Sequence, residues 1–217
     1  MDIQILQIVF SVAILIMSVV IHEVSHGYAA LMLGDSTAKY QDRLTLNPLK
    51  HLDPIGSVIV PIVGFVTAGF IVGWAKPVPY NPYNLRNQRW GELWVAIAGP
   101  LSNISVAVVF GLIARFGAGS ISATFVGFSL WVMFVNFGLA IFNLIPIPPL
   151  DGSKVLFSFL PSRFREFRVH MERYAMLLIL LLILVPVFGN LISWIVIKAS
   201  LLTSGLSVQS LIQYLSF

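Results

Sequence analysis

Two histidines, His22 and His26, stand four residues apart in this sequence, a spacing that suits metal binding. On a helix, such residues project from one face with Cβ atoms about 5–6 Å apart, so both imidazoles can reach one ion at about 2.0–2.1 Å. Glu23 follows the first histidine and can accept a proton from water activated by the metal. The stretch HEVSH therefore matches the H-E-x-x-H pattern of two metal ligands and a general base.

The same spacing also arises by chance on the surface of helices. Here, however, it lies within an apolar run over residues 3–33, which is longer than one bilayer crossing requires. Ionisable side chains at membrane depth cost several kcal/mol, so three of them together need a common reason to be present. A metal site provides that reason.

A catalytic zinc site needs a third protein ligand and an open fourth position. The chain has no cysteine, so the third ligand must come from His, Asp, Glu or a backbone oxygen. Asp151 directly follows the prolines that end an apolar run, and an irregular turn there can fold its carboxylate back towards the bilayer. Asp151-Gly152 is also an ordinary turn sequence, but beside an incomplete metal site we favour Asp151 as the third ligand.

The composition is that of a membrane protein. Of the 217 residues, 58% are hydrophobic and 10% are charged, and the mean hydropathy is +0.90. A soluble domain carries about 25% charged residues. Charged residues are scarce along the whole chain, so we expect a single domain over residues 1–217. Within it we expect a catalytic core at about 3–155 and a C-terminal span and tail at about 174–217. The net charge of +4 is explained by the rule that Lys and Arg gather in the cytosolic loops of membrane proteins. The sequence has no basic patch interleaved with aromatic residues, so it does not indicate nucleic-acid binding.

Long apolar helices must position these ligands. The apolar segments cover residues 3–33, 55–74, 90–116, 121–145 and 174–198, and a weakly amphipathic tail follows to 217. The first segment lacks a basic leader region and a cleavage site, so we expect a mature helix rather than a secretory signal. Pro186 and Gly189 leave open whether the C-terminal region is one span with a surface helix or two short spans. The pattern predicts an all-α polytopic transmembrane bundle, with a re-entrant or extended segment between the first and third apolar segments.

Lys and Arg residues indicate the orientation of this bundle. They gather after the first, second and fourth segments, at positions 39, 43, 50, 76, 86, 89, 154, 163, 165, 168 and 173. The positive-inside rule places these loops in the cytosol. Residues 55–74 would then enter and return without crossing, which suits their Gly and Pro content, although a full crossing stays an alternative. The first and fourth segments would run in the same direction, as one shared metal requires, and the site would lie towards the cytosolic side of the cell membrane.

HEVSH in an early apolar segment, GPLSN in a later one and NLIPIPPLDG after the next resemble the site-2 protease family of intramembrane zinc metalloproteases. The resemblance is greatest to the short branch that has neither a PDZ nor a CBS domain, and LNPLKHLDPIGS and GWAKPVPYNPYNLR share in it. It implies that His22, His26 and Asp151 bind one Zn²⁺ per chain and that Glu23 is the general base. It further implies that Asn143 steadies the tetrahedral intermediate, for which the alternative is a helix cap or an interhelical hydrogen bond.

Other polar residues have two interpretations each. Gly99-Pro100 should kink the third apolar segment, and Ser102 and Asn103 could shape a water path to the metal or simply allow close helix packing. His51 could support the metal site or contact substrate, or it could be a solvated loop histidine.

Two further features lie in or beside the loops. His170 lies in a basic loop and should be interfacial. Residues 73–85 are rich in Pro, Asn and Tyr, which predicts an extended segment that could pair with an unwound substrate.

The pattern favours an intramembrane zinc metalloendopeptidase that hydrolyses peptide bonds of transmembrane proteins within or near the bilayer. The alternative is a membrane zinc transporter or zinc sensor. A transporter has no need of Glu23 as a base and would offer ligands through the bilayer, whereas the ionisable residues here gather at one depth. A catalytically silent scaffold is disfavoured by the intact HEVSH, and the oligomeric state stays open.

Overall fold

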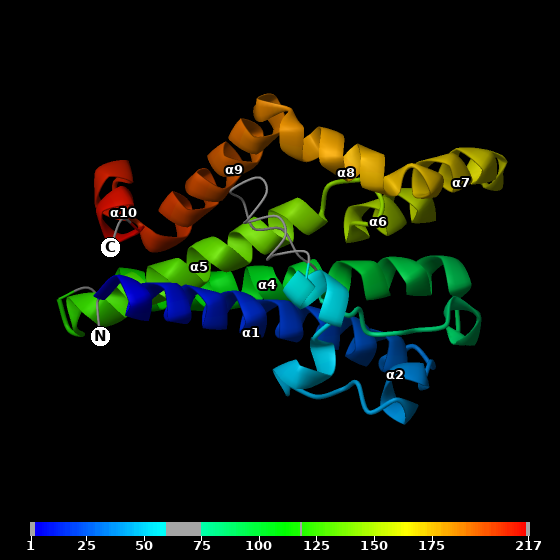
Figure 1. Cartoon of the computed structure of the whole chain (residues 1–217), viewed down its shortest axis with the longest axis horizontal. Coiled ribbons are helices and arrows are strands. Elements are labelled where there is room, and N and C mark those ends of the chain that lie inside the picture. Colours follow the sequence, from blue (N-terminus) through cyan, green and yellow to red (C-terminus); the bar gives the residue numbers. More distant parts are fainter. Residues whose placement is uncertain (1–2, 60–74, 118, 216–217) are drawn as a thin grey trace.

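Three long helices form the body of the molecule and lie side by side in Figure 1. The computed structural model describes residues 3–59, 75–117 and 119–215. Helix α1 spans Ile3–Met32, α4 spans Gln88–Gly117 and α5 spans Ala123–Asn143. Together with α9 (Pro186–Ser204), these are the four helices in the described part of the chain that are long and apolar enough to cross a membrane. The expected all-α polytopic membrane bundle is confirmed.

Shorter helices connect and flank the long ones. They are α2 (Thr37–Tyr40), a 3-10 turn at Pro48–His51, a π-helical turn at Pro54–Ile59, a 3-10 turn at Pro82–Asn84, α6 (Asp151–Phe159), a 3-10 turn at Ser162–Phe164, α7 (Arg165–Arg173), α8 (Ala175–Leu184) and α10 (Val208–Leu215). The largest apolar core lies where α4, α5, α9 and α10 meet, and its buried residues are Ala107, Ala114, Val126, Leu130, Met133, Phe137, Val196 and Leu211.

Local signals explain where the long helices begin and end. Gly34 follows α1 with φ of 111°, a left-handed conformation that glycine adopts without strain, so the helix stops where the sequence predicts. Ser122 caps α5, because its hydroxyl accepts a hydrogen bond from the Phe125 N–H at 3.3 Å. Helix α4 continues through Pro100, and the kink expected there stays a prediction.

Helices α1 and α5 run in the same direction and α4 runs against them (Figure 1). The connection from α1 to α4 therefore begins and ends at one end of the bundle. Backbone hydrogen bonds fasten it there, from Arg86 N to Leu33 O at 3.0 Å and from Lys76 N to His51 O at 2.8 Å. The parallel course of the first and fourth apolar segments, which a shared metal requires, is thus present. The predicted re-entrant path falls largely on residues 60–74, outside the described residues.

The carboxylate of Asp35 ties this connection to the end of α1. It is fully buried and accepts hydrogen bonds from the Thr37 hydroxyl (2.6 Å), the Asn84 amide (2.8 Å) and the Asn81 N–H (2.7 Å). Burial on its own would raise the pKa of Asp35, but these hydrogen bonds outweigh it and hold the pKa below its usual value. The ionised carboxylate therefore stabilises the folded loop.

The substitution Asp35→Asn is expected to destabilise the protein by about 1–3 kcal/mol, because donors that pointed at a carboxylate would meet an amide N–H₂. The folded-state pKa is lowered, so the stabilisation is present above the unfolded pKa of about 3.9 and is lost as pH falls through the folded value. Thermal unfolding in detergent should show a lower midpoint for Asp35→Asn at neutral pH and a narrowing difference in acid. An equal difference at both pH values would contradict this role.

The C-terminal region divides at Pro186, one of the two residues at which the sequence left a division open. The apolar run predicted from residue 174 breaks at Val185, where Pro186 starts a new helix. Helix α8 has 10 residues, too few to cross a bilayer, whereas α9 has 19 and can.

The basic stretch before α8, expected as a loop, is instead helix α7. An ion pair of 2.8 Å between Arg168 and Glu172, four residues apart, supports that helix.

Candidate metal centre

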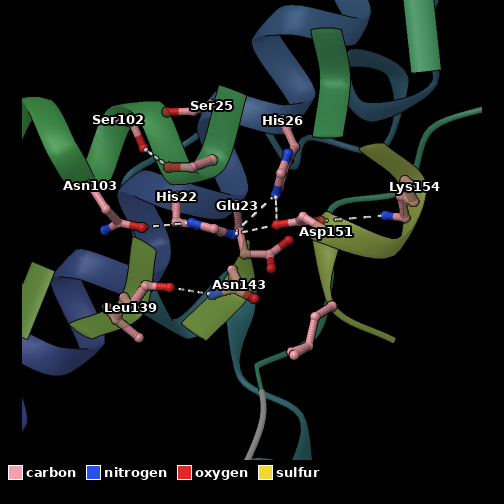
Figure 2. A network of polar contacts seen from close by, with 12 residues as sticks. His22, Glu23, Ser25, His26, Ser102, Asn103, Leu139, Asn143, Asp151 and Lys154 are labelled. Carbon is pink, nitrogen blue, oxygen red and sulfur yellow. Dashed lines mark hydrogen bonds and ion pairs between the residues drawn. The ribbon is translucent and has the colours of Figure 1, made fainter. Parts of the chain in front are cut away.

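Three predicted ligands meet in the interior of the molecule, although they come from distant parts of the chain (Figure 2). His22 and His26 lie on α1, and Asp151 is the first residue of α6. Asp151 Oδ2 is 3.0 Å from Nε2 of each histidine, and the two Nε2 atoms are 3.1 Å apart. All three side chains are buried. The structure therefore brings together the residues that the sequence singled out.

An irregular turn after α5 delivers Asp151 to this cluster. The chain folds back over residues 144–150, with a hydrogen bond from Leu150 N to Ile147 O at 3.0 Å. Gly152 lies directly on the backbone carbonyl of Leu144, where a Cβ atom would not fit. The turn that the prolines predict is thus present, but it precedes Asp151, which itself begins a helix. Lys154 lies 3.6 Å from Asp151 Oδ1 and so leaves Oδ2 to face the histidines.

The donor set fits a divalent cation. His26 Nδ1 lies 2.6 Å from the carbonyl oxygen of Val95, which can only accept, so Nδ1 carries the proton and Nε2 presents a lone pair. His22 Nδ1 lies 2.6 Å from Oδ1 of Asn103. Lone pairs and a carboxylate oxygen about 3 Å apart repel one another unless a proton or a metal cation lies between them. Ligands at about 2.0–2.1 Å in a tetrahedron lie about 3.3–3.4 Å apart, so these residues fit Zn²⁺ with only slight opening.

Glu23 lies beside the cluster and not within it (Figure 2). Its Oε2 accepts a hydrogen bond from the Val78 N–H at 2.8 Å. Val78 belongs to the non-helical residues 75–81, which Arg43 fastens through hydrogen bonds to the carbonyls of Lys76 and Pro77. The described part of the predicted extended stretch is therefore free of helix up to Asn81, and a 3-10 turn follows.

Other predicted polar residues make local contacts. Asn143 ends α5 and donates from Nδ2 to the Leu139 carbonyl at 2.9 Å, a bond within its own helix. His51 is 1% exposed and donates from Nε2 to the Thr45 carbonyl at 2.9 Å, so a solvated loop histidine was the wrong interpretation. His170 is exposed on α7 and lies outside the ligand cluster.

Helix α4 contacts the ligand histidines directly, whereas the sequence offered Gly99 and Asn103 only a water path to the metal or a packing role. Val95, Gly99 and Asn103 are spaced by four and form one stripe that faces the histidines of α1. A Cβ atom on Gly99 would lie 2.5 Å from His26 Nε2 and 2.6 Å from His22 Nε2. The available signal was the four-residue spacing of Gly99 and Asn103 within GPLSN, which matches the spacing of the two histidines.

Comparisons with known proteins agree with this geometry. The family model "Peptidase family M50" matches residues 111–186, a segment that contains Asn143 and Asp151. YwhC of Bacillus subtilis is 36% identical over 198 residues, which cover 88% of this chain and 86% of YwhC. Rip2 of Mycolicibacterium smegmatis is 27% identical over 82% of this chain and 70% of its own length.

A more distant similarity links the chain to zinc metalloprotease MJ0392 of Methanocaldococcus jannaschii, which is 26% identical over 70% of this chain and 34% of that protein. No solved structure matches the chain. The extent of the similarity to YwhC, together with the family match, is decisive. The chain belongs to peptidase family M50, the site-2 protease family of zinc metalloproteases.

Proposed function

We propose that this protein is an intramembrane endopeptidase that hydrolyses peptide bonds of transmembrane substrates within or near the bilayer. One Zn²⁺ per chain would be held by His22, His26 and Asp151. The observation that carries the proposal is the convergence of three ligand atoms within 4.8 Å of one another, two of them inside the apolar helix segment Ile8–Met32. Buried ionisable groups at membrane depth are functional by default.

The chain's own residues would divide the work as follows. Bound Zn²⁺ supplies Lewis-acid chemistry that activates water and polarises a peptide carbonyl. Glu23 takes the proton of the attacking water at its carboxylate and passes it to the leaving amine. The Val78 N–H, 2.8 Å from Glu23 Oε2, holds that carboxylate in one orientation. The Asn143 amide donates one hydrogen to Leu139 and has a second hydrogen that can stabilise the developing oxyanion.

Substrate would be held in extended form along residues 75–81. This segment is non-helical and is joined to Glu23 through Val78, so a strand paired with it would pass beside the general base. A helical substrate would have to unwind first, because its backbone is already hydrogen bonded. Substrates with weak helix propensity near the cleaved bond are therefore preferred.

The site would face the cytosolic side of the membrane. The turn before α6 and the connection between α1 and α4 lie at the same end of the three-helix body (Figure 1). Lys and Arg follow the helices that end there, and the positive-inside rule assigns such loops to the cytosol.

Purified protein in lipid vesicles with a single-span model substrate tests this function. Wild type is expected to contain zinc and to cleave, whereas Glu23→Gln should retain zinc and cleave about 10²- to 10⁴-fold more slowly, the range for loss of a general base. Glu166→Gln on the exposed face of α7 makes the same chemical change away from the site and should cleave like wild type. Undiminished cleavage by Glu23→Gln would reject the mechanism. Zinc in both proteins without cleavage by either would favour a transporter or sensor.

A further inference from the structure

We propose that the side-chain amides of Asn103 and Asn136 form a buried hydrogen-bonded relay that sets the tautomer and the ring orientation of His22. The relay comprises His22 and Ser18 on α1, Asn103 on α4 and Asn136 on α5, so it crosses three helices. That the ion is zinc rests on the proposed function. The relay itself rests on the hydrogen bonds between these four residues.

The hydrogen bonds of the relay are short and enclosed. His22 Nδ1 is 2.6 Å from Asn103 Oδ1, and Asn103 Nδ2 is 2.7 Å from Asn136 Oδ1. Asn136 Nδ2 is in turn 2.8 Å from the Ser18 hydroxyl and 2.9 Å from the Val132 carbonyl. Asn103 and Asn136 are fully buried and Ser18 is 4% exposed. Because these side chains are buried, each donor must meet an acceptor within the protein.

Two backbone carbonyls give the relay its direction. The Val132 carbonyl can only accept, so the group of Asn136 that faces it must be the amide N–H₂, and the oxygen of Asn136 then faces Asn103. That oxygen also only accepts, so Asn103 must turn its N–H₂ towards it.

The Ser18 carbonyl, 3.2 Å from Asn103 Nδ2, requires the same orientation of that amide. Asn103 is left with its oxygen towards His22.

The orientation of Asn103 determines the tautomer of His22 at the metal site. Asn103 Oδ1 can only accept, so His22 Nδ1 must carry the proton and Nε2 must offer its lone pair to the ion. His26 reaches the same state more simply, through the carbonyl of Val95. The two ligand histidines therefore both present Nε2 to the ion. His26 is held by a backbone carbonyl directly, and His22 is held through side-chain amides.

Interhelical hydrogen bonding alone would explain why Asn103 and Asn136 are buried. It would not explain why their amides are oriented so that an acceptor faces His22. Polar side chains between membrane helices commonly stabilise packing. If that were the whole role, loss of the relay would lower stability and leave the intrinsic affinity of the folded site for zinc unchanged. Partners that fix a metal-binding histidine instead change metal affinity on the order of 10- to 100-fold.

The first test compares Asn103→Leu with Asn103→Asp by chelator competition on purified full-length protein. Asn103→Leu keeps the size but removes the acceptor, and its dissociation constant for Zn²⁺ should rise about 10- to 100-fold. Asn103→Asp keeps an oxygen at His22 Nδ1 but loses the donor to Asn136 Oδ1 and the Ser18 carbonyl, so it should be less stable than wild type and still bind Zn²⁺ more tightly than Asn103→Leu. Ser129→Ala removes a buried hydroxyl on α5 outside the relay and should leave affinity unchanged.

A second readout follows the tautomer itself. In metal-free protein at alkaline pH, nitrogen-15 NMR of labelled histidine should show His22 protonated at Nδ1 in wild type and a mixture of tautomers in Asn103→Leu. Asn136→Leu does not touch His22 and should act in the same direction but more weakly, because the Ser18 carbonyl still orients Asn103. It also serves as the second variant if Asn103→Leu does not fold.

Specific results would overturn the relay. Wild-type affinity for Zn²⁺ and an unchanged His22 tautomer in a folded Asn103→Leu protein would exclude Asn103 from this role. The same results for Asn136→Leu would exclude Asn136. An equal loss of affinity in Ser129→Ala would show a general packing effect. Wild-type protein that binds zinc but cleaves nothing would defeat the proposed function while leaving the relay supported or refuted by its own measurements.

Discussion

Asp151→Ala is expected to abolish cleavage and to weaken zinc binding by more than about 100-fold, beyond the effect of losing a partner that only orients a ligand. The substitution removes the one ligand that α1 does not supply and leaves two histidines, a set with too few protein donors for a catalytic site. Zinc content after purification and a chelator titration would measure the loss.

The matched control is Asp35→Ala. Asp35 is also a buried carboxylate that accepts several hydrogen bonds, so its loss lowers stability, but it lies outside the ligand cluster. It should therefore keep zinc and cleave substrate at temperatures where it is folded. If Asp151→Ala retained zinc as tightly as wild type, Asp151 would not be a ligand. An equal loss of zinc in Asp35→Ala would show a general effect of losing a buried carboxylate.

The sequence predicted those residues of the site that short-range patterns identify. His22 and His26 share a helix face because they are four residues apart, and a helix of apolar residues was evident from its length. Asp151 was predictable because prolines end a helix and force a turn. In each case the prediction used residues only a few positions apart. The ligands that meet are nevertheless far apart in the chain, since Asp151 lies 129 residues after His22 and 125 after His26.

The contacts from α4 were not predictable in the same way. Whether Asn103 faces His22 depends on the rotation of α4 about its own axis, which is decided by packing against α1 and α5 together. A polar residue in a membrane helix indicates only that some partner exists. The partner of Asn103 could not be chosen from spacing alone, and its orientation depends further on Asn136, 33 residues away.

The C-terminal region shows a different limit. Residues 174–198 form an apolar run by composition, but Pro186 cannot continue the hydrogen bonding of α8 and begins α9 instead. Proline inside an apolar run is compatible with a continuous helix, as α4 shows by continuing through Pro100. The outcome depends on whether neighbouring helices support the backbone, which the sequence does not state.

Gly99→Ala is expected to lower zinc affinity and to slow cleavage on the order of 100-fold, the loss of rate that follows when reacting groups are displaced by about 1 Å. The added methyl would lie 2.5 Å from His26 Nε2 and 2.6 Å from His22 Nε2, so α4 or the imidazoles must move. Neither move is easy, because Asn103 and Val95 of the same helix hold the other nitrogen of each ring. Zinc titration and cleavage assays would measure the effect, and circular dichroism should show unchanged helix content.

Gly138→Ala makes the same change on α5, where nothing lies within 4 Å of the new methyl. Alanine favours helix over glycine by up to about 1 kcal/mol, so this variant should keep full zinc affinity with equal or higher stability. The same propensity gain acts at Gly99, and there it should be overridden by the clash with the ligands. Because intrinsic propensity predicts the same sign for both variants, opposite outcomes can come only from the close approach of α4 to the histidines. Full zinc affinity in Gly99→Ala would show that the backbone of α4 does not confine them.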